Sequence, residues 1–183
     1  MIRLTVATVP LALCLLAGSA MADELPSRKA GLWEVKMSME GRQMPAQTMQ
    51  QCIDATTDQE MRQPPGMEGV DVSKMCSKRE LKRAGDTMTM DSICTFSGKT
   101  SKTHMVINGS FDSAYTMKVS VSHDEPSPHG DMVMSMDAKW LGACKPDQKP
   151  GDLIMPGGMK ININDMKKMR AGGGTAQPGA PGR

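Results

Sequence analysis

Methionine is the residue type with the most distinctive chemistry in this sequence. The chain has 20 Met, against 2 Trp, 1 Tyr and 2 Phe. Several are spaced Met-x-Met, at Met37/Met39, Met88/Met90 and Met132/Met134/Met136. Thioether sulfurs are soft ligands that suit Cu(I), and alternate residues of a strand point to the same side. Methionine is also a flexible apolar filler of cores, and a methionine-rich interior can leave a deformable cavity for an apolar ligand. A plain core, a ligand cavity and a copper site therefore all stay open.

The cysteines form a second group with chemical potential. Cys14 lies in the apolar N-terminal run, and the other four are Cys52, Cys76, Cys94 and Cys144. An even number of cysteines in a small exported chain predicts two disulfides formed in an oxidising compartment. Four free thiols are the alternative. A zinc site is disfavoured, because the sequence has no Cys-x-x-Cys and no clustered histidines.

The three histidines give weaker indications. His123 and His129 flank a stretch that contains Asp124 and Glu125, which allows a shallow metal-binding loop. A polar hairpin turn set by the nearby prolines and Gly130 is the simpler interpretation. His104 lies alone in a strand and is expected to be exposed or paired locally. The residues of any metal site stay unknown at this stage.

Motifs of catalysis are missing from the sequence. There is no Gly-x-Ser-x-Gly and no His-Glu-x-x-His, and Gly98-Lys99-Thr100 lacks the glycine that a phosphate loop needs at position 93. The Asp and Glu residues are spread over polar faces, with no pair in an apolar setting. We therefore expect a protein that is not an enzyme and has no cofactor. The net charge of +2 and the few aromatic residues also argue against a nucleic-acid partner.

The N-terminal residues have the composition of an export signal. Arg3 is followed by an apolar run from Leu4 to Leu16, and Ala20-Met21-Ala22 fits the small-x-small rule of signal peptidase. We expect residues 1–22 to be a signal peptide, cleaved after Ala22, and the mature protein to be periplasmic or secreted. A lipid anchor at Cys14 is disfavoured, because a large residue precedes it. After residue 22 the sequence has no apolar run long enough to span a membrane, so we expect no transmembrane segment in the mature protein.

The elements that must position these residues are predicted to be strands. Apolar and polar residues alternate with period two in 31–40, 114–123 and 131–140, which is typical of antiparallel strands with one buried face. Similar runs occur at 47–53, 75–83, 87–96 and 102–111, and turn residues separate them. One capping box, Thr57-x-x-Glu60, predicts a short helix at about 57–62. The pattern predicts a mainly β fold, an antiparallel meander of about seven strands that forms a barrel or half-barrel.

The strand register suggests how the cysteines pair. A three-residue turn at 84–86 would set Cys76 opposite Cys94. Cys52 would then pair with Cys144, if the seventh strand runs antiparallel to the first. We expect this disulfide-bonded β domain to span 23–144. Residues 145–183 are rich in Pro and Gly, with seven Lys or Arg against three Asp. They are expected to form a basic tail that is largely disordered, apart from one short amphipathic helix that includes Ile161, Ile163, Met166 and Met169.

Several of these segments together resemble a known family. They are Gly31–Val35 (GLWEV), MQQC at 49–52, a Pro-Pro-Gly loop, Cys76 followed by ELKRAGDTMTM, Cys94, and WLGAC at 140–144. This order resembles a family of small exported proteobacterial proteins that is described only as a domain of unknown function, over about residues 28–144. The resemblance implies an envelope location and a β-rich domain. It implies no activity, substrate or catalytic residue.

The leading hypothesis from the sequence is a periplasmic binding protein without catalytic activity, which holds a small apolar ligand in a methionine-lined interior. Copper handling by Met-x-Met pairs and a structural or interaction module of the cell envelope are the alternatives, and no protein partner is indicated. The residues expected to line the interior are Trp33, Met37, Met39, Met88, Met90, Met117, Met132, Met134 and Met136.

Overall fold

The part of the chain that the structure describes forms one strongly curved antiparallel sheet with two helices and one short 3₁₀ turn. A computed structural model describes residues 24–41, 45–63, 71–124 and 130–171. The predicted signal peptide, residues 1–22, lies outside the described residues. The strands of the sheet are β1 (Gly31–Met39), β2 (Gln47–Ile53), β3 (Cys76–Ala84), β4 (Thr87–Phe96), β5 (Lys99–Ser110), β6 (Ala114–His123), β7 (Met132–Gly142), β8 (Asp152–Ile154) and β9 (Lys160–Asn162).

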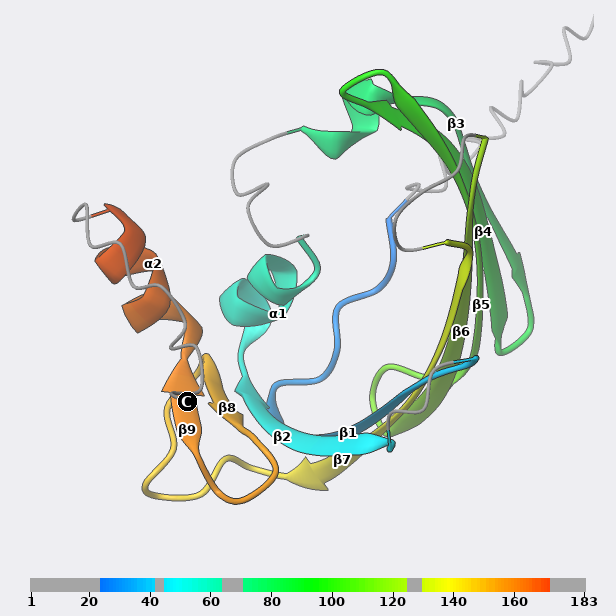
Figure 1. The fold of residues 1–183 in the computed structure, drawn as a ribbon. Coiled ribbons are helices and arrows are strands. Elements are labelled where there is room, and N and C mark those ends of the chain that lie inside the picture. The colour runs from blue at the N-terminus through cyan, green and yellow to red at the C-terminus, as the bar shows by residue number, and fades with distance from the viewer. Residues whose placement is uncertain (1–23, 42–44, 64–70, 125–129, 172–183) are drawn as a thin grey trace, which may run out of the picture.

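The nine strands are ordered β3-β4-β5-β6-β7-β1-β2-β8-β9, and every pair is antiparallel. Strands β3 to β7 form the predicted meander, and β7 runs antiparallel to β1, as expected. The mainly β antiparallel fold predicted from the period-two alternation is therefore confirmed. Figure 1 shows the sheet curled into an open arc, whose concave side we call the inner face and whose convex side we call the outer face. We call the space on the concave side, where α1 and the segment 24–30 lie, the hollow.

The sheet does not close into a barrel, so the closed form of the prediction is not what the structure shows. Strand β3 begins the sheet order, and no described strand joins it to β2. Helix α1 (Ala55–Met61) follows β2 directly, and it lies in the gap between β2 and the 3₁₀ turn (Val72–Met75) that leads into β3 (Figure 1). The described parts of this link, α1 and the 3₁₀ turn, thus lie on the open side of the arc and do not add a strand to β2.

The turn between β3 and β4 is shorter than predicted. Ala84 pairs with Thr87, so only Gly85 and Asp86 form the turn, and that register alone would not place Cys76 opposite Cys94. A register shift between Cys76 and Lys78 restores the pairing, because one extra residue on the bulged strand moves the partner by one position. The structure joins Cys76 to Cys94 and Cys52 to Cys144. These are the two predicted pairs, reached in the first case through a two-residue turn and a bulge.

Helix α1 begins two residues earlier than the predicted range of 57–62. Its N-cap is Asp54, whose side chain accepts a hydrogen bond of 2.8 Å from the Thr57 amide. In return, the Thr57 hydroxyl accepts a hydrogen bond of 2.9 Å from the Asp54 amide. The predicted Thr57-x-x-Glu60 box was therefore wrong. Asp54 and Thr57 form a capping box of their own, three residues apart. Each side chain pairs a backbone amide that the first helical turn leaves without an intrahelical partner.

The segment after Cys144 is folded over most of its length, which corrects the expectation of a largely disordered tail for 145–183. Strands β8 and β9 form a hairpin that β8 attaches to β2. Helix α2 (Ile163–Ala171) follows, where the sequence suggested a short helix, and the Asn162 side chain accepts a hydrogen bond of 3.0 Å from the Asn164 amide at its start. The last residues of the predicted tail, 172–183, lie outside the described residues.

No helix in the described parts of the chain is long and apolar enough to cross a membrane.

Candidate functional site

The inner face of the sheet is covered by ordered rows of apolar side chains. Residues directly opposite each other on neighbouring strands share a face, so the pairing register defines each row. One row runs from β4 to β1 through Met88, Ile107, Met117, Met136 and Met37. The next row, two residues further along each strand, contains Met90, Met105, Val119, Met134 and Met39. The predicted Met-x-Met residues therefore all lie on the inner face.

The two ends of the inner face differ in burial. One end forms the core, which consists of Trp33, Val35, Met49, Ile53, Met88, Ile107, Tyr115 and Ala138. Toward the other end, the methionines are only half-buried. Of the predicted lining residues, Trp33 at 0 % and Met88 at 7 % exposure belong to the closed core and present no surface to a ligand. The half-buried ones are Met37, Met39, Met90, Met117, Met132, Met134 and Met136.

A buried charged cluster closes the core end. The carboxylate of Asp58 in α1 is fully buried, and it accepts hydrogen bonds from the Arg28 amide at 2.9 Å and the Arg28 Nε at 2.7 Å. Arg62 also pairs with this carboxylate and donates hydrogen bonds of 2.7 Å to the carbonyl oxygens of Leu25 and Pro26. The cluster therefore clamps the extended segment 24–30 against α1 inside the hollow, as the paths of both in Figure 1 show.

The clamp also reaches the aromatic core. Arg28 lies 5.7 Å from the ring centroid of Trp33, and its Nη1 donates a hydrogen bond of 2.8 Å to Gln51. Tyr115 stacks on Phe111 with ring centroids 4.6 Å apart and meets Trp33 at 5.8 Å. Burial raises the pKa of the Tyr115 phenol above its usual value, and the nearby Arg28 guanidinium partly opposes the shift.

Sequence reasoning missed this cluster. Asp58 was assigned to a polar face, because its local sequence is polar and nothing near it predicts burial. Its position in α1, one residue after the N3 residue Thr57, could have been found by placing the N-cap at Asp54. The apolar residues Met49, Met105 and Val119, which lie on the same inner face, were also not singled out.

The half-open end contains a small cavity of about 90 Å³ lined by Met37, Ser38, Met39, Pro45, Gln47 and Met134. Larger hollows lie on the outer face, such as one of about 500 Å³ between β5, β6 and β7. Its lining includes His104, Lys118 and Asp137. The outer rows carry many charged and hydroxyl side chains, whereas the inner rows are made mostly of apolar ones.

The histidines form no metal site in the described parts of the chain. His104 Nδ1 lies 2.7 Å from Asp91 Oδ1 on the outer face, so it is paired locally as predicted, and this hydrogen bond lowers the pKa of Asp91. His123 lies at the end of β6, and His129 lies outside the described residues. Within the ranges that the structure describes, no group of three or more His, Cys, Asp or Glu could hold a metal ion.

The fold and the inner face together define a class: a small β-rich domain with two disulfides and an open, curved sheet. The family model of a protein of unknown function, DUF3617, matches residues 28–144, and the chain belongs to this family. The matched range begins at Arg28 of the buried clamp and ends at Cys144 of the longer disulfide. The comparison with curated proteins and the comparison with solved structures found no match.

Proposed function

We propose that the protein is an exported, non-catalytic binding protein that holds a small apolar ligand on the methionine-covered inner face of its open sheet. The observation that carries this proposal is the partial burial of eight inner-face methionines, the seven predicted ones and Met105, next to a core that is already buried. These side chains are too apolar to be exposed without cost, at about 25 cal/mol for each Å² of apolar surface in water. A bound apolar molecule would remove that surface from water.

The composition of the surface suits such a ligand. Methionine side chains are unbranched and polarizable, so they adapt to ligands of different shape. The curved sheet runs as an open arc from β3 to β2 (Figure 1), and a cavity of about 90 Å³ lies beside the inner-face residues Met37, Met39 and Met134. One disulfide lies near each end of this arc, Cys76–Cys94 at β3 and Cys52–Cys144 at β2. The backbone around the adaptable methionine side chains is therefore held by covalent bonds.

Export supports the same proposal. Disulfides form and persist outside the reducing cytosol, and both pairs join residues of the sheet or its immediate continuation. Protein isolated from the periplasm should begin at Asp23 and carry no free thiol. The intact mass with and without reduction measures both properties, and an uncut precursor with all five cysteines reduced, Cys14 included, would exclude this location.

The binding test uses an uncharged apolar fluorophore, N-phenyl-1-naphthylamine, titrated into the purified protein. Met134→Asp places a charge on the inner face, whereas Ser135→Asp places the same charge on the outer face one residue further along β7. We expect Met134→Asp to weaken binding of the probe at least about tenfold, because the new carboxylate must lose water against an apolar ligand, and Ser135→Asp to leave it unchanged. Equal binding by both variants, or none by the native protein, would contradict the proposal.

Copper handling is a second candidate that one observation favours. The register places Met37 and Met117 directly opposite Met136 from both sides, and Cβ atoms of such neighbours lie about 4.5–5.5 Å apart. Three thioethers from three strands are thus better placed to share one Cu(I) than a Met-x-Met pair on one strand. In a Cu(I) titration with a competing chelator, Met136→Leu should lose binding, and the exposed Met159→Leu should not. Native affinity of micromolar or weaker removes this candidate.

A further inference from the structure

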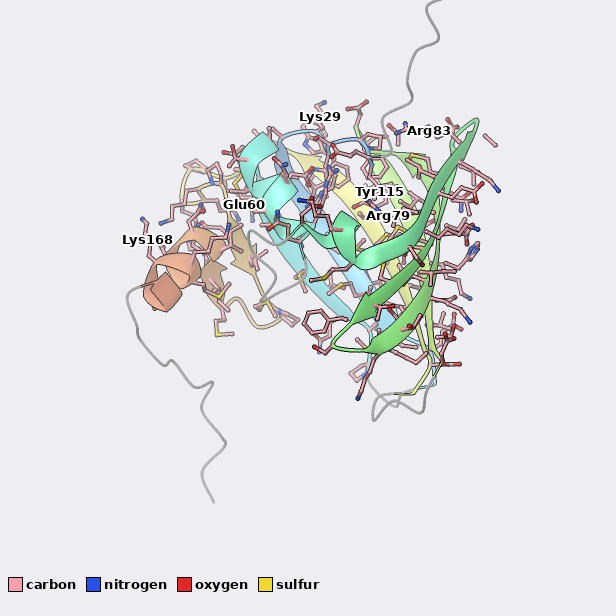
Figure 2. All side chains as sticks on the ribbon, turned by 90° about the horizontal axis from the view of Figure 1, so that it is seen from above. Lys29, Glu60, Arg79, Arg83, Tyr115 and Lys168 are labelled. Carbon is pink, nitrogen blue, oxygen red and sulfur yellow. A yellow bond between two sulfur atoms is a disulfide. The ribbon has the colours of Figure 1, made fainter. Side chains whose placement is uncertain are left out.

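The apolar rows of the inner face give way to polar residues at one end. Beyond the row of Met90, Met105, Val119 and Met134, the next row begins with Arg79, Ser92 and Thr103 on β3, β4 and β5. The row after that includes His123 on β6. We call Arg79, Ser92, Thr103 and His123 the polar end. Figure 2 shows Arg79 on the inner side of β3, the side on which Tyr115 lies.

The polar end has hydrogen-bonding groups that the fold does not use. Arg79 is exposed and has no hydrogen bond or ion pair with any residue that the structure describes, and the same holds for the Ser92 and Thr103 hydroxyls. The Nδ1 atom of His123 is buried and has no hydrogen-bond partner. Buried polar atoms are nearly always paired, so this imidazole nitrogen, which lies one row beyond Thr103 on the neighbouring strand, adds an unused polar atom to this end of the inner face.

The other cations of β3 are occupied, which sets Arg79 apart. Lys78 and Lys82 lie on the outer face and pair with Glu80 at 3.3 and 3.0 Å. Arg83 shares the inner face with Arg79, and its Nη2 donates a hydrogen bond of 3.0 Å to the Glu24 carbonyl oxygen. Among the four basic residues of β3, Arg79 therefore differs from the others, because its N–H donors have no partner among the described residues. It lies at the border of the apolar rows.

We propose that the ligand of the inner face is an anionic amphiphile, whose carboxylate or phosphate head group binds at Arg79 with Ser92 and Thr103, and whose apolar chain lies along the methionine rows. This inference rests on the proposed function and names its ligand class. A guanidinium presents paired N–H donors that match carboxylate and phosphate oxygens in a bidentate arrangement. The two hydroxyls add donors from the two neighbouring strands.

The dimensions agree with a long chain. The row that starts at Leu81 and runs through Met90, Met105, Val119 and Met134 to Met39 crosses six strands, β3 to β7 and then β1. Neighbouring strands lie about 4.8 Å apart, so this row measures roughly 24 Å along the sheet. An extended acyl chain can cross it with its head group at the β3 edge, next to Arg79.

The experiment measures displacement of N-phenyl-1-naphthylamine by dodecanoate, dodecyl phosphate, dodecanol and dodecyltrimethylammonium. The native protein should bind the two anions at least about tenfold more tightly than the alcohol or the cation, since a charge-assisted bidentate contact is worth about that factor or more. The ratio between dodecanoate and dodecyl phosphate then tells a fatty-acid head group from a phosphate one. Arg79→Gln should lose the preference for anions and retain the affinity for dodecanol.

Two matched variants separate the head-group contact from net charge and from folding. Lys82→Gln removes the same charge from the outer face of the same strand, and should leave all four affinities unchanged. Thr103→Val keeps the shape of the side chain and should weaken only the anions, by a few-fold. Retained dodecanol binding shows that each variant is folded.

The outcomes distinguish this inference from the proposed function. If the native protein binds the probe and dodecanol as tightly as the anions, or if Arg79→Gln keeps the preference for anions, the head-group site is wrong and the apolar site stands. If the native protein binds neither the probe nor any amphiphile, both fail together. A loss of anion preference in Lys82→Gln equal to that in Arg79→Gln would reduce the effect to net charge and overturn the assignment to Arg79.

Discussion

The two tryptophans of the chain have complementary roles at the start of the domain. Trp33 is fully buried, and its Nε1 donates a hydrogen bond of 2.8 Å to the Lys29 carbonyl oxygen. Trp140 lies opposite it on β7 and donates one of 3.1 Å to the carbonyl oxygen of Ala30. Lys29 also lies over the Trp140 ring, 3.7 Å from its centroid. The GLWEV and WLGAC segments thus meet to fix the entry of the chain into the sheet.

Gly31, between these contacts, tolerates no side chain. Its φ is +132°, and an added Cβ would lie 2.3 Å from the Gly142 carbonyl oxygen. We predict that Gly31→Ala lowers the free energy of unfolding by about 3 kcal/mol or more, because backbone must shift in addition to the unfavourable φ. Gly41→Ala is the matched control, since φ there is +74° and no atom lies within 4 Å. It should cost about 1–2 kcal/mol. Urea unfolding measures both, and equal losses would exclude the close approach as the cause.

The single tyrosine of the chain allows a direct test of its burial. Because burial raises the pKa of Tyr115 above the ordinary 10.0, the phenol of the folded protein should ionise at higher pH than that of the unfolded chain. The unfolded state therefore loses this proton first, and stability falls as pH rises above about 10. The ultraviolet absorbance of the phenolate reports the titration in native protein and in denaturant. A native midpoint at or below the denatured one would contradict the buried position.

At the scale of elements, the segment 24–30 and α1 depend on each other through Asp58. Asp58→Ala leaves Arg28 and Arg62 without their shared carboxylate, one of them inside the core. We predict a loss of about 3–5 kcal/mol in the free energy of unfolding, the range for breaking one partner of a buried ion pair. Asp58→Asn keeps an acceptor oxygen and should lose less.

Asp165→Asn serves as the control for this loss. Asp165 pairs with Lys149 at 3.1 Å and Lys168 at 3.9 Å on the exposed side of α2, and exposed pairs contribute about 0–1 kcal/mol. Limited proteolysis gives a second readout, because only the Asp58 variants should expose residues 24–30. An Asp58→Ala protein as stable as Asp165→Asn would show that the buried pair does not hold the segment.

The same elements show what periodicity can and cannot predict. Seven strands alternate over seven residues or more, so their positions followed from the sequence within a few residues. Strands β8 and β9 have three residues each, too short for any alternation to be recognised. Asp58 could not be predicted as buried from its polar local sequence, because the segment that packs over it carries Arg28, which is 30 residues away in the chain. Arg79 faces inward by the register of a strand that was predicted, but its lack of a partner is a three-dimensional property.

At the scale of the molecule, closure of the sheet was the feature that the sequence left open. Whether seven or more curved strands close depends on where the link between β2 and β3 travels. Here that link forms α1, which lies against the hollow and is tied to α2 by an ion pair of 2.8 Å between Glu60 and Lys167. The covered core at one end and the accessible methionines at the other both follow from this path.

The two disulfides should differ in how much they stabilise the fold and in which strands they protect. Cys52–Cys144 closes a separation of 92 residues and Cys76–Cys94 one of 18. In the chain-entropy model these loops contribute about 4–5 and about 3 kcal/mol to stability. We therefore predict that replacing Cys52 and Cys144 by Ser costs more than replacing Cys76 and Cys94, as measured by denaturant unfolding of each double variant.

The strands that each disulfide protects are those next to its cysteines. The carbonyl oxygen of Cys52 accepts a hydrogen bond of 2.8 Å from the Gly151 amide, just before β8. Loss of Cys52–Cys144 should therefore raise amide hydrogen exchange in β8 and β9 well below the global unfolding transition, because the bridge and this hydrogen bond hold the same edge of the sheet. Loss of Cys76–Cys94 should raise exchange only at the start of β3 and the end of β4. Unchanged protection of β8 and β9 without the longer bridge would mean that the C-terminal hairpin is held by its pairing with β2 alone.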